Sequence, residues 1–267
     1  MIKTPDFTFS DGLTHGLVGP NGIGKTTLLR KIAGQLGGSG ITVDGEKPFD
    51  NEKVLNKVVL MGIDNPLPEG WNMKKVFTVS SLRWPTWNKE RAEELVERFE
   101  LPMKNYSGLS RGQKSAASFI VAVASGVPIM LLDEPYLGLD AAKREVFYDV
   151  LREEHGRTII VSTHHLNELS GLLDTVALMG ENPLSGPIDE FIEGVVKLTG
   201  PAEALDRALG RLSLPVLERE SSAVADRALV DARPNHSTNV FDMAQEMGLR
   251  ASEVSLEQAV LALGETR

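Results

Sequence analysis

The chain reads Gly-Pro-Asn-Gly-Ile-Gly-Lys-Thr from Gly19 to Thr26, which fits the pattern G-x-x-x-x-G-K-[ST]. The apolar run Gly16 to Val18 comes directly before this loop, and a segment of helical character, Thr26 to Leu36, comes directly after it. Between a strand and a helix, glycines allow backbone N–H groups to turn toward phosphate oxygens, and the helix N-terminus adds positive potential. A glycine-rich turn with a chance lysine rarely meets both conditions, so the sequence predicts a phosphate-binding loop.

Two side chains of this loop have roles that follow from their chemistry. Lys25 can reach the β- and γ-phosphates of a nucleotide, and the hydroxyl of Thr26 can bind Mg²⁺. The predicted nucleotide-binding residues are Asn21, Gly22, Gly24, Lys25, Thr26 and Thr27.

An acidic pair ends a second apolar stretch. Ile129 to Leu132 predicts a short buried strand, and Asp133 and Glu134 follow it. In proteins with such a phosphate-binding loop, this strand delivers a carboxylate to the Mg²⁺ of the nucleotide, a role that suits Asp133. Glu134 would then polarise a water for attack on the γ-phosphate. On its own an Asp-Glu pair is often a solvated turn, but together with the loop it indicates a metal ligand and a catalytic base.

Composition excludes several other classes of function. The 267 residues are 42% hydrophobic and 24% charged, which is typical of a globular protein, and the net charge of -9 gives no broad basic surface for nucleic acid. The absence of cysteine excludes disulfides, Cys-ligated metals and thiol chemistry. Met1 to Pro20 has no export signal, and the apolar stretch Phe119 to Leu132 is too broken to span a membrane. We therefore expect a cytoplasmic protein without a nucleic-acid partner.

Short apolar segments alternate with helical ones along most of the chain. This alternation predicts an α/β fold in which helices cover both faces of a mostly parallel sheet. Residues 66–88 hold all three tryptophans and are expected to be irregular. The predicted strands lie within 2–18 and at 41–43, 58–61, 129–132, 158–161 and 176–179, and the predicted helices at 26–36, 92–99, 110–124 and 143–151.

A turn-rich segment, Pro183 to Pro187, predicts a boundary between two parts of the chain. Residues 1–187 would form the nucleotide-binding domain, and residues 188–267 a small α+β appendage. The appendage has no catalytic constellation, and His236 stands alone among polar residues. A packing role is the simplest interpretation of the appendage, with a regulatory or dimer-contact role as the alternative.

Three further motifs complete a recognisable order. Leu109 to Gln113 reads Leu-Ser-Arg-Gly-Gln, residues 138–140 read Gly-Leu-Asp, and residues 162–164 read Ser-Thr-His. With the two motifs above, this order resembles the ABC transporter ATPases over about residues 13–182. The resemblance implies a P-loop NTPase core with an antiparallel edge and a helical subdomain at about 66–125.

The resemblance also implies roles for these motifs. His164 would contact the γ-phosphate of ATP and act in catalysis beside Glu134, and Asp140 would belong to the D-loop. The signature residues Ser110, Arg111, Gly112 and Gln113 would bind the nucleotide held by a partner subunit. Since the chain has one set of motifs, it would need a second nucleotide-binding subunit, as a homodimer or a heterodimer.

A closer resemblance is to the ATPase subunits of bacterial ABC-2-type exporters, in the bacitracin-efflux-like branch. It rests on Trp84-Pro85-Thr86-Trp87 before a helix that ends at Glu97 to Leu101, on Arg111 in the signature and on Val254 to Val260. It implies that the chain energises export through a separate integral membrane permease, lying on the inner face of the cell membrane.

Two positions depart from the family pattern. Asp64 occupies the position of the Q-loop glutamine, where a carboxylate could meet Mg²⁺ directly or through water and could slow hydrolysis. Tyr136 stands where many relatives have threonine, with no consequence that the sequence reveals.

Two other classes of function compete with an exporter subunit. One is an ABC ATPase that acts without a membrane channel, of which single-domain cluster-assembly ATPases are the hardest to separate. The other, a GTPase or kinase, is disfavoured because Asn56-Lys57 and Asn88-Lys89 lack the aspartate of N-K-x-D. Importer ATPases share the core motifs, so the direction of transport rests on the subgroup resemblance.

Overall fold

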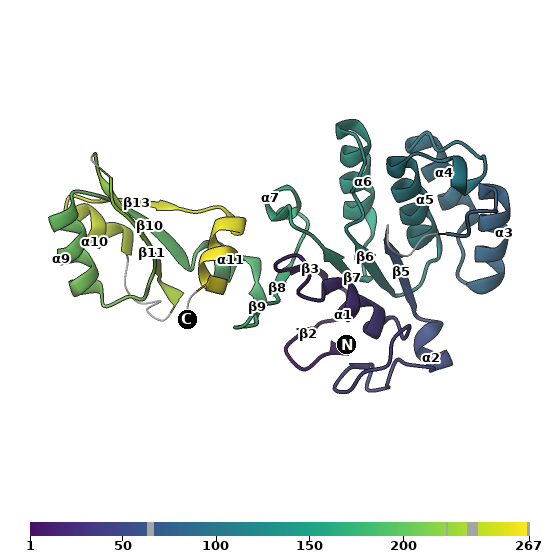
Figure 1. Ribbon diagram of the computed structural model, residues 1–267, viewed down its shortest axis with the longest axis horizontal. Helices are drawn as coiled ribbons and strands as arrows, with labels where there is room; N and C mark the ends of the chain where they lie inside the picture. Colours follow the sequence, from purple (N-terminus) through teal and green to yellow (C-terminus); the bar gives the residue numbers. More distant parts are fainter. Residues whose placement is uncertain (63–66, 223, 234–239, 266–267) are drawn as a thin grey trace. The chain divides into compact units, whose positions relative to one another are not determined.

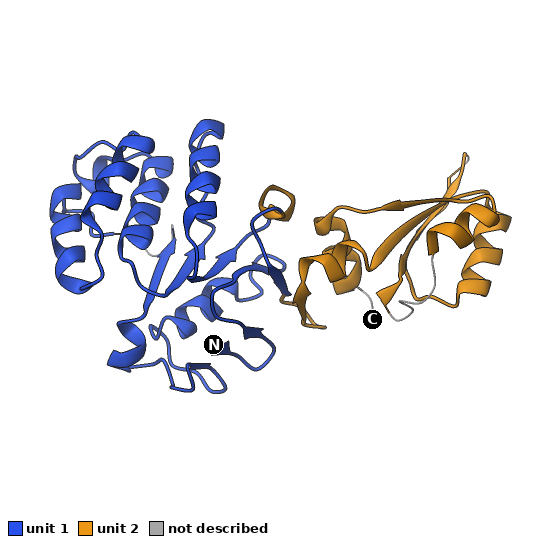
Figure 2. Ribbon diagram, turned by 180° about the vertical axis from the view of Figure 1, so that it is seen from behind, with its two compact units in different colours: residues 1–164, 171–177 blue, residues 165–170, 178–267 orange. Residues whose placement is uncertain are grey.

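The computed structural model describes residues 1–62, 67–222, 224–233 and 240–265. The chain divides into two compact units, shown in Figures 1 and 2. Unit 1 comprises residues 1–164 and 171–177, and unit 2 comprises residues 165–170 and 178–267. The sequence predicts a domain boundary after residue 187. Compact units are not the same as domains, so this boundary stays a prediction.

Unit 1 is built on a sheet whose strands lie in the order β5-β6-β7-β3-β8. The pairs β5–β6, β6–β7 and β7–β3 are parallel. Their residues are almost all buried because α1 covers one side of the sheet and α5 and α6 the other (Figure 1). The mostly parallel sheet is confirmed. Its strands are β3 (Thr14–Val18), β5 (Val58–Gly62), β6 (Ile129–Asp133), β7 (Thr158–Ser162) and β8 (Thr175–Leu178).

A small antiparallel sheet lies at the N-terminal end of unit 1. Its strands are β1 (Ile2–Lys3), β2 (Thr8–Phe9) and β4 (Thr42–Val43), in the order β2-β1-β4. Helix α1 (Lys25–Ile32) ends earlier than the predicted 26–36. Gly34 causes the early end, because its φ is +71° and a Cβ there would lie 2.4 Å from the carbonyl oxygen of Pro48. A short helix, α2 (Glu52–Leu55), precedes β5.

The helical part of unit 1 corrects one prediction. Residues expected to be irregular contain α3 (Met73–Arg83), whose N-cap Asn72 accepts a hydrogen bond from the backbone N–H of Lys75. Only Met73, Val76 and Ser80 are buried along α3, so its apolar stripe is too narrow to stand out in the sequence. The other elements are α4 (Lys89–Arg98), the 3-10 turn η1 (Tyr106–Gly108) and α5 (Arg111–Ala124).

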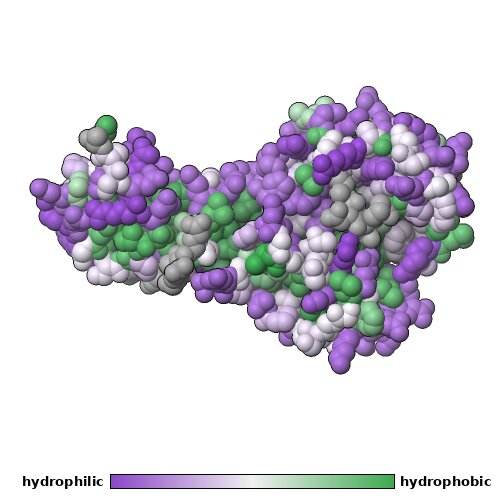
Figure 3. Space-filling view, viewed as in Figure 1, coloured by the Kyte–Doolittle hydropathy of each residue, from purple (hydrophilic) through white to green (hydrophobic). Residues whose placement is uncertain are grey.

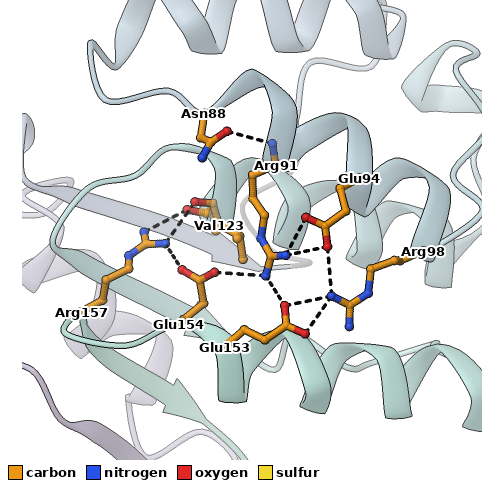
Figure 4. A network of polar contacts seen from close by, with 9 residues as sticks. Asn88, Arg91, Glu94, Arg98, Val123, Glu153, Glu154 and Arg157 are labelled. Carbon is orange, nitrogen blue, oxygen red and sulfur yellow. Dashed lines mark hydrogen bonds and ion pairs between the residues drawn. The ribbon is translucent and has the colours of Figure 1, made fainter.

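A network of six charged side chains joins α4 to α6 (Ala141–Glu153), which extends beyond the predicted 143–151 at both ends (Figure 4). Arg91 contacts Glu94, Glu153 and Glu154. Its other members are Arg98, which bonds to Glu94 and Glu153, and Arg157, which bonds to Glu154 and to the carbonyl oxygens of Ala122, Val123 and Val127. We call these six residues, Arg91, Glu94, Arg98, Glu153, Glu154 and Arg157, the subdomain charge network. On the face of unit 1 seen in Figure 3, hydrophilic residues predominate.

Unit 2 contains a sheet of four antiparallel strands in the order β11-β12-β10-β13. With α9 and α10, the strands follow the order β-α-β-β-α-β, which is the ferredoxin-like arrangement. Leu198, Leu205, Ala228 and Val230 lie in the core between helices and sheet. The elements of unit 2 are α7 (Leu166–Leu169), β9 (Leu184–Pro187), α8 (Ile188–Ile192), β10 (Val195–Gly200), α9 (Ala202–Leu212), β11 (Val216–Glu220), β12 (Asp226–Asp231), α10 (Val240–Glu246), β13 (Arg250–Glu253) and α11 (Leu256–Glu265).

Among the described residues, no helix combines the length and the apolar character that crossing a membrane would require.

Candidate functional site

The phosphate-binding loop lies between β3 and α1, as the sequence predicts. Lys25 is a buried residue, and its ammonium group donates to the carbonyl oxygens of Gly19 and Pro20, at 2.7 and 3.3 Å. Gly24, the N-cap of α1, has a φ of +109°, which an L side chain would oppose. The lysine is thus held inside the loop whose N–H groups would face a phosphate.

A pair of hydroxyls holds the carboxylate of Asp133 at the end of β6. Thr26 donates to one carboxylate oxygen and Ser162 donates to the other, both at 2.6 Å. Asp133 and Ser162 are partners in the parallel register of β6 and β7, so the two strand ends bring them together. A threonine hydroxyl beside a carboxylate offers the hard oxygen ligands that Mg²⁺ prefers, so Thr26 and Asp133 fit a magnesium ion shared with phosphates.

Glu134 follows directly and is held by three contacts. Its backbone N–H donates to Ser162 Oγ at 2.9 Å, and the Tyr136 hydroxyl donates to Oε2 at 2.9 Å. His164 Nδ1 lies 3.0 Å from Oε1 and 2.9 Å from Oε2. The backbone of Glu134 has a φ of +47°, a conformation that costs a non-glycine residue about 1–3 kcal/mol and is concentrated at functional sites. The acidic pair predicted from the sequence therefore lies beside the predicted histidine.

Tyr136 lies behind this carboxylate. Its hydroxyl hydrogen-bonds to Thr163 Oγ1 and accepts from the backbone N–H of His164 at 3.3 Å. Burial raises the pKa of the Tyr136 phenol far above its usual range, so the phenol keeps its proton at neutral pH.

The signature residues form a second group. Ser110 caps α5 in a capping box, in which Ser110 and Gln113 exchange hydrogen bonds between side chain and backbone at 3.0 and 3.3 Å. Gly112 faces Gly138, since a Cβ on Gly112 would lie 2.2 Å from the Gly138 carbonyl oxygen. Asp140 caps α6 by accepting from the backbone N–H of Lys143 at 2.9 Å. The signature and the D-loop are therefore in direct contact within one subunit.

The remaining predicted residues have simpler positions. Asn21, Gly22, Thr27 and Arg111 are exposed, as groups that meet a ligand or a partner can be. Asp64 lies outside the described residues, and so does His236. The binding and catalytic roles of all these residues stay predictions.

The sequence analysis named Tyr136, Ser162 and Thr163 but gave none of them a role in the site. Ser162 could have been found, because it ends the strand next to the one that ends in Asp133, and parallel strands meet at their carboxyl ends. The contact between Tyr136 and Thr163 has no such signal, since it depends on how a side chain turns behind the strand ends.

Known proteins resemble this chain in sequence. A family profile described as ABC transporter matches residues 2–137. The chain is 28% identical over 231 residues to the ABC transporter ATP-binding protein YtrB of Bacillus subtilis, with 82% of this chain and 78% of that protein covered. It is 28% identical over 240 residues to the daunorubicin/doxorubicin resistance ATP-binding protein DrrA of Streptomyces peucetius, with 84% and 68% covered.

Solved structures resemble it in fold. An ATP-binding subunit of an ABC transporter superposes with a TM-score of 0.63 at 21% identity, covering 72% of this chain and 92% of that one. A dimeric ATP-binding cassette in a post-hydrolysis state, bound to ADP and Pi, superposes with a TM-score of 0.59 at 21% identity, covering 69% and 98%. At these identities the likeness shows the fold alone, and it confirms the predicted P-loop NTPase architecture.

Proposed function

Because the chain belongs to the ABC transporter family and is an ATP hydrolase of that family, we propose that it energises export through a separate membrane permease. The observation that supports ATP hydrolysis as the source of energy is the contact of Glu134 with His164 beside the Thr26–Asp133 pair. The name of the Streptomyces relative, a drug-resistance protein, supports export as the direction.

The proposed chemistry is hydrolysis of the γ-phosphate of ATP. Lys25 and the backbone N–H groups of the loop would bind the β- and γ-phosphates, and His164 would bind the γ-phosphate from the opposite side. A Mg²⁺ ion held by Thr26 and Asp133 would neutralise charge on the phosphate oxygens. Glu134 would orient a water molecule and accept its proton while the water oxygen attacks the γ-phosphorus and the bond to the ADP oxygen breaks.

A second nucleotide-binding subunit would complete the site. We place Ser110, Arg111, Gly112 and Gln113 against the nucleotide of that subunit, and Asp140 in the D-loop. The exposure of Arg111 and the dimeric state named for one structural relative support this arrangement. ATP would close the dimer by binding the closed state more tightly, and the permease would hold the pair at the inner face of the cell membrane.

Asp64 is proposed to lower the rate of ATP hydrolysis. A carboxylate at the Q-loop position would add negative charge close to the γ-phosphate and slow hydrolysis, even where it binds Mg²⁺. Asp64→Gln should raise the steady-state ATPase rate of the full chain. An unchanged rate in this variant would remove the proposal.

Glu134→Gln tests the catalytic assignment. We expect this variant to bind ATP, to lose hydrolysis by about 10²-fold or more and to accumulate as an ATP-bound dimer in size-exclusion chromatography. Glu145→Gln is the matched control, because Glu145 is an exposed carboxylate on α6. Full turnover by Glu134→Gln would overturn the assignment.

Affinity purification of the tagged chain from detergent-solubilised native membranes tests the transporter role. Recovery of a multi-span membrane protein would support the role. Recovery of soluble proteins alone would instead favour an ABC ATPase that acts without a channel.

A further inference from the structure

Tyr136 is 1% exposed and lies between the candidate site and the core of unit 1. Its ring packs edge-on against Phe147, with centroids 6.4 Å apart, and against the His164 ring at 6.2 Å. This packing leaves the ring little freedom, so the position of its hydroxyl is set by the core.

Only one assignment of donors and acceptors fits the three hydrogen bonds of the Tyr136 hydroxyl. A phenol has one proton, and the Glu134 carboxylate, 2.9 Å away, can only accept it. The backbone N–H of His164 can only donate, and it does so to the phenol oxygen at 3.3 Å. Thr163 must then donate as well, because the phenol proton is already used. The hydroxyl thus ties the Glu134 side chain to the backbone of residues 163–164.

His164 and Tyr136 hold Glu134 in different ways. His164 is 45% exposed and its ring contacts both carboxylate oxygens, so it can leave Glu134 when it turns toward a γ-phosphate. Tyr136 is buried and stays in place. After His164 leaves, the phenol still donates to the Glu134 carboxylate and so restricts its other rotamers.

We propose that Tyr136 is a positioning residue for hydrolysis. It holds the Glu134 carboxylate in the orientation that meets the attacking water, and it couples the position of this carboxylate to the backbone of the segment Ser162 to His164. The proposal rests on the proposed role of Glu134. A displacement of about 1 Å in such a group can cost about 10²-fold in rate.

Tyr136→Phe in the full chain tests the proposal. It removes the hydroxyl and keeps the ring that packs on Phe147. We expect kcat for ATP hydrolysis to fall by about 10- to 100-fold, while KM and the equilibrium affinity for ATP stay within about twofold. Tyr148→Phe is the control, because it removes the hydroxyl of a second buried tyrosine, which lies outside the site, and it should keep kcat.

Thr163→Val gives an independent route, which also serves if Tyr136→Phe does not fold. It removes the donor on the far side of the phenol, so kcat should again fall at unchanged KM. In a Tyr136→Phe background the same change should add little, because both variants break one chain of hydrogen bonds.

The outcomes separate this proposal from the catalytic assignment. If Glu134→Gln stalls hydrolysis and Tyr136→Phe keeps full kcat, the positioning role is wrong and the catalytic assignment stands. Equal losses of kcat and ATP affinity, or additive effects of the two variants, would also overturn it, since they indicate a general structural role. If Glu134→Gln itself keeps full turnover, both proposals fall.

Discussion

Unit 1 contains two polar networks that differ in how their charges are balanced. The subdomain charge network pairs three arginines with three glutamates, and Arg157 also satisfies three backbone carbonyls (Figure 4). At the candidate site, the carboxylates of Asp133 and Glu134 are held mainly by hydroxyls and a histidine. Lys25, the cation of the phosphate loop, donates to carbonyl oxygens of its own loop.

This difference separates stability from function. The charges of the subdomain charge network balance one another without a ligand. Removing one of its side chains should therefore lower the free energy of unfolding. Carboxylates that are held mainly by hydroxyls, without an arginine or lysine partner, retain negative charge for a metal ion and for a reacting water, so their loss should cost activity. Each variant below is expected to affect one property and to leave the other nearly unchanged.

Asp133→Asn should have the largest effect. The amide keeps an oxygen that can accept from Ser162, so we expect the free energy of unfolding to change by less than about 1.5 kcal/mol. The loss of the carboxylate should reduce Mg²⁺-dependent ATP hydrolysis by about 10²-fold or more. Phosphate-release kinetics and urea unfolding measure the two properties. A variant that loses stability in proportion to activity would contradict the comparison.

Arg157→Ala should affect stability instead. It leaves Glu154 and the carbonyls at the end of α5 without this guanidinium, which is buried to 11% exposure, so we expect a loss of about 2–4 kcal/mol in urea unfolding. ATP affinity of the folded protein should be unchanged. A loss of less than about 0.5 kcal/mol would show that this network is not a stabilising one.

Acid should weaken the subdomain charge network gradually. Hydrogen bonds from Arg98 and Arg91 lower the pKa of Glu153, and one from Arg91 lowers that of Glu94. A carboxyl whose folded pKa lies below its unfolded value of about 4.3 stabilises the fold above that pH, and the contribution is lost as pH falls through the folded pKa. Unfolding free energies between about pH 5 and 2 should therefore fall less steeply in Glu153→Gln than in the wild type. An identical slope would contradict this prediction.

Arg152→Ala should have the smallest effect. Arg152 pairs with Asp149 on the exposed surface of α6, where side chains that are more than half exposed are well hydrated. We expect a change of less than about 0.5 kcal/mol in unfolding and no change in hydrolysis. It is the matched control for Arg157→Ala, and a loss as large as that of Arg157→Ala would remove the distinction between paired and networked charges.

The sequence predicted the parts of the molecule whose signals are local. Apolar runs such as Ile129 to Leu132 predicted buried parallel strands, and the motif at Gly19 to Thr26 predicted the loop between strand and helix. The helix predicted at 110–124 is confirmed as α5, which begins directly after its N-cap Ser110.

Features that depend on distant contacts were missed. Helix α3 buries one narrow stripe, and its start depends on the Asn72 cap, so periodicity did not reveal it. Tyr136 became part of the site only because Thr163 and His164 come from a neighbouring strand end.

The left-handed backbone at Glu134 has a consequence for how this position tolerates mutation. Glycine adopts a φ of +47° without steric cost, so Glu134→Gly should relieve strain while it removes the carboxylate. A screen for thermal tolerance alone would therefore favour glycine at this position, whereas a screen for ATP hydrolysis would eliminate it. The two selections oppose each other at a single codon, and the glutamate persists only where activity is under selection.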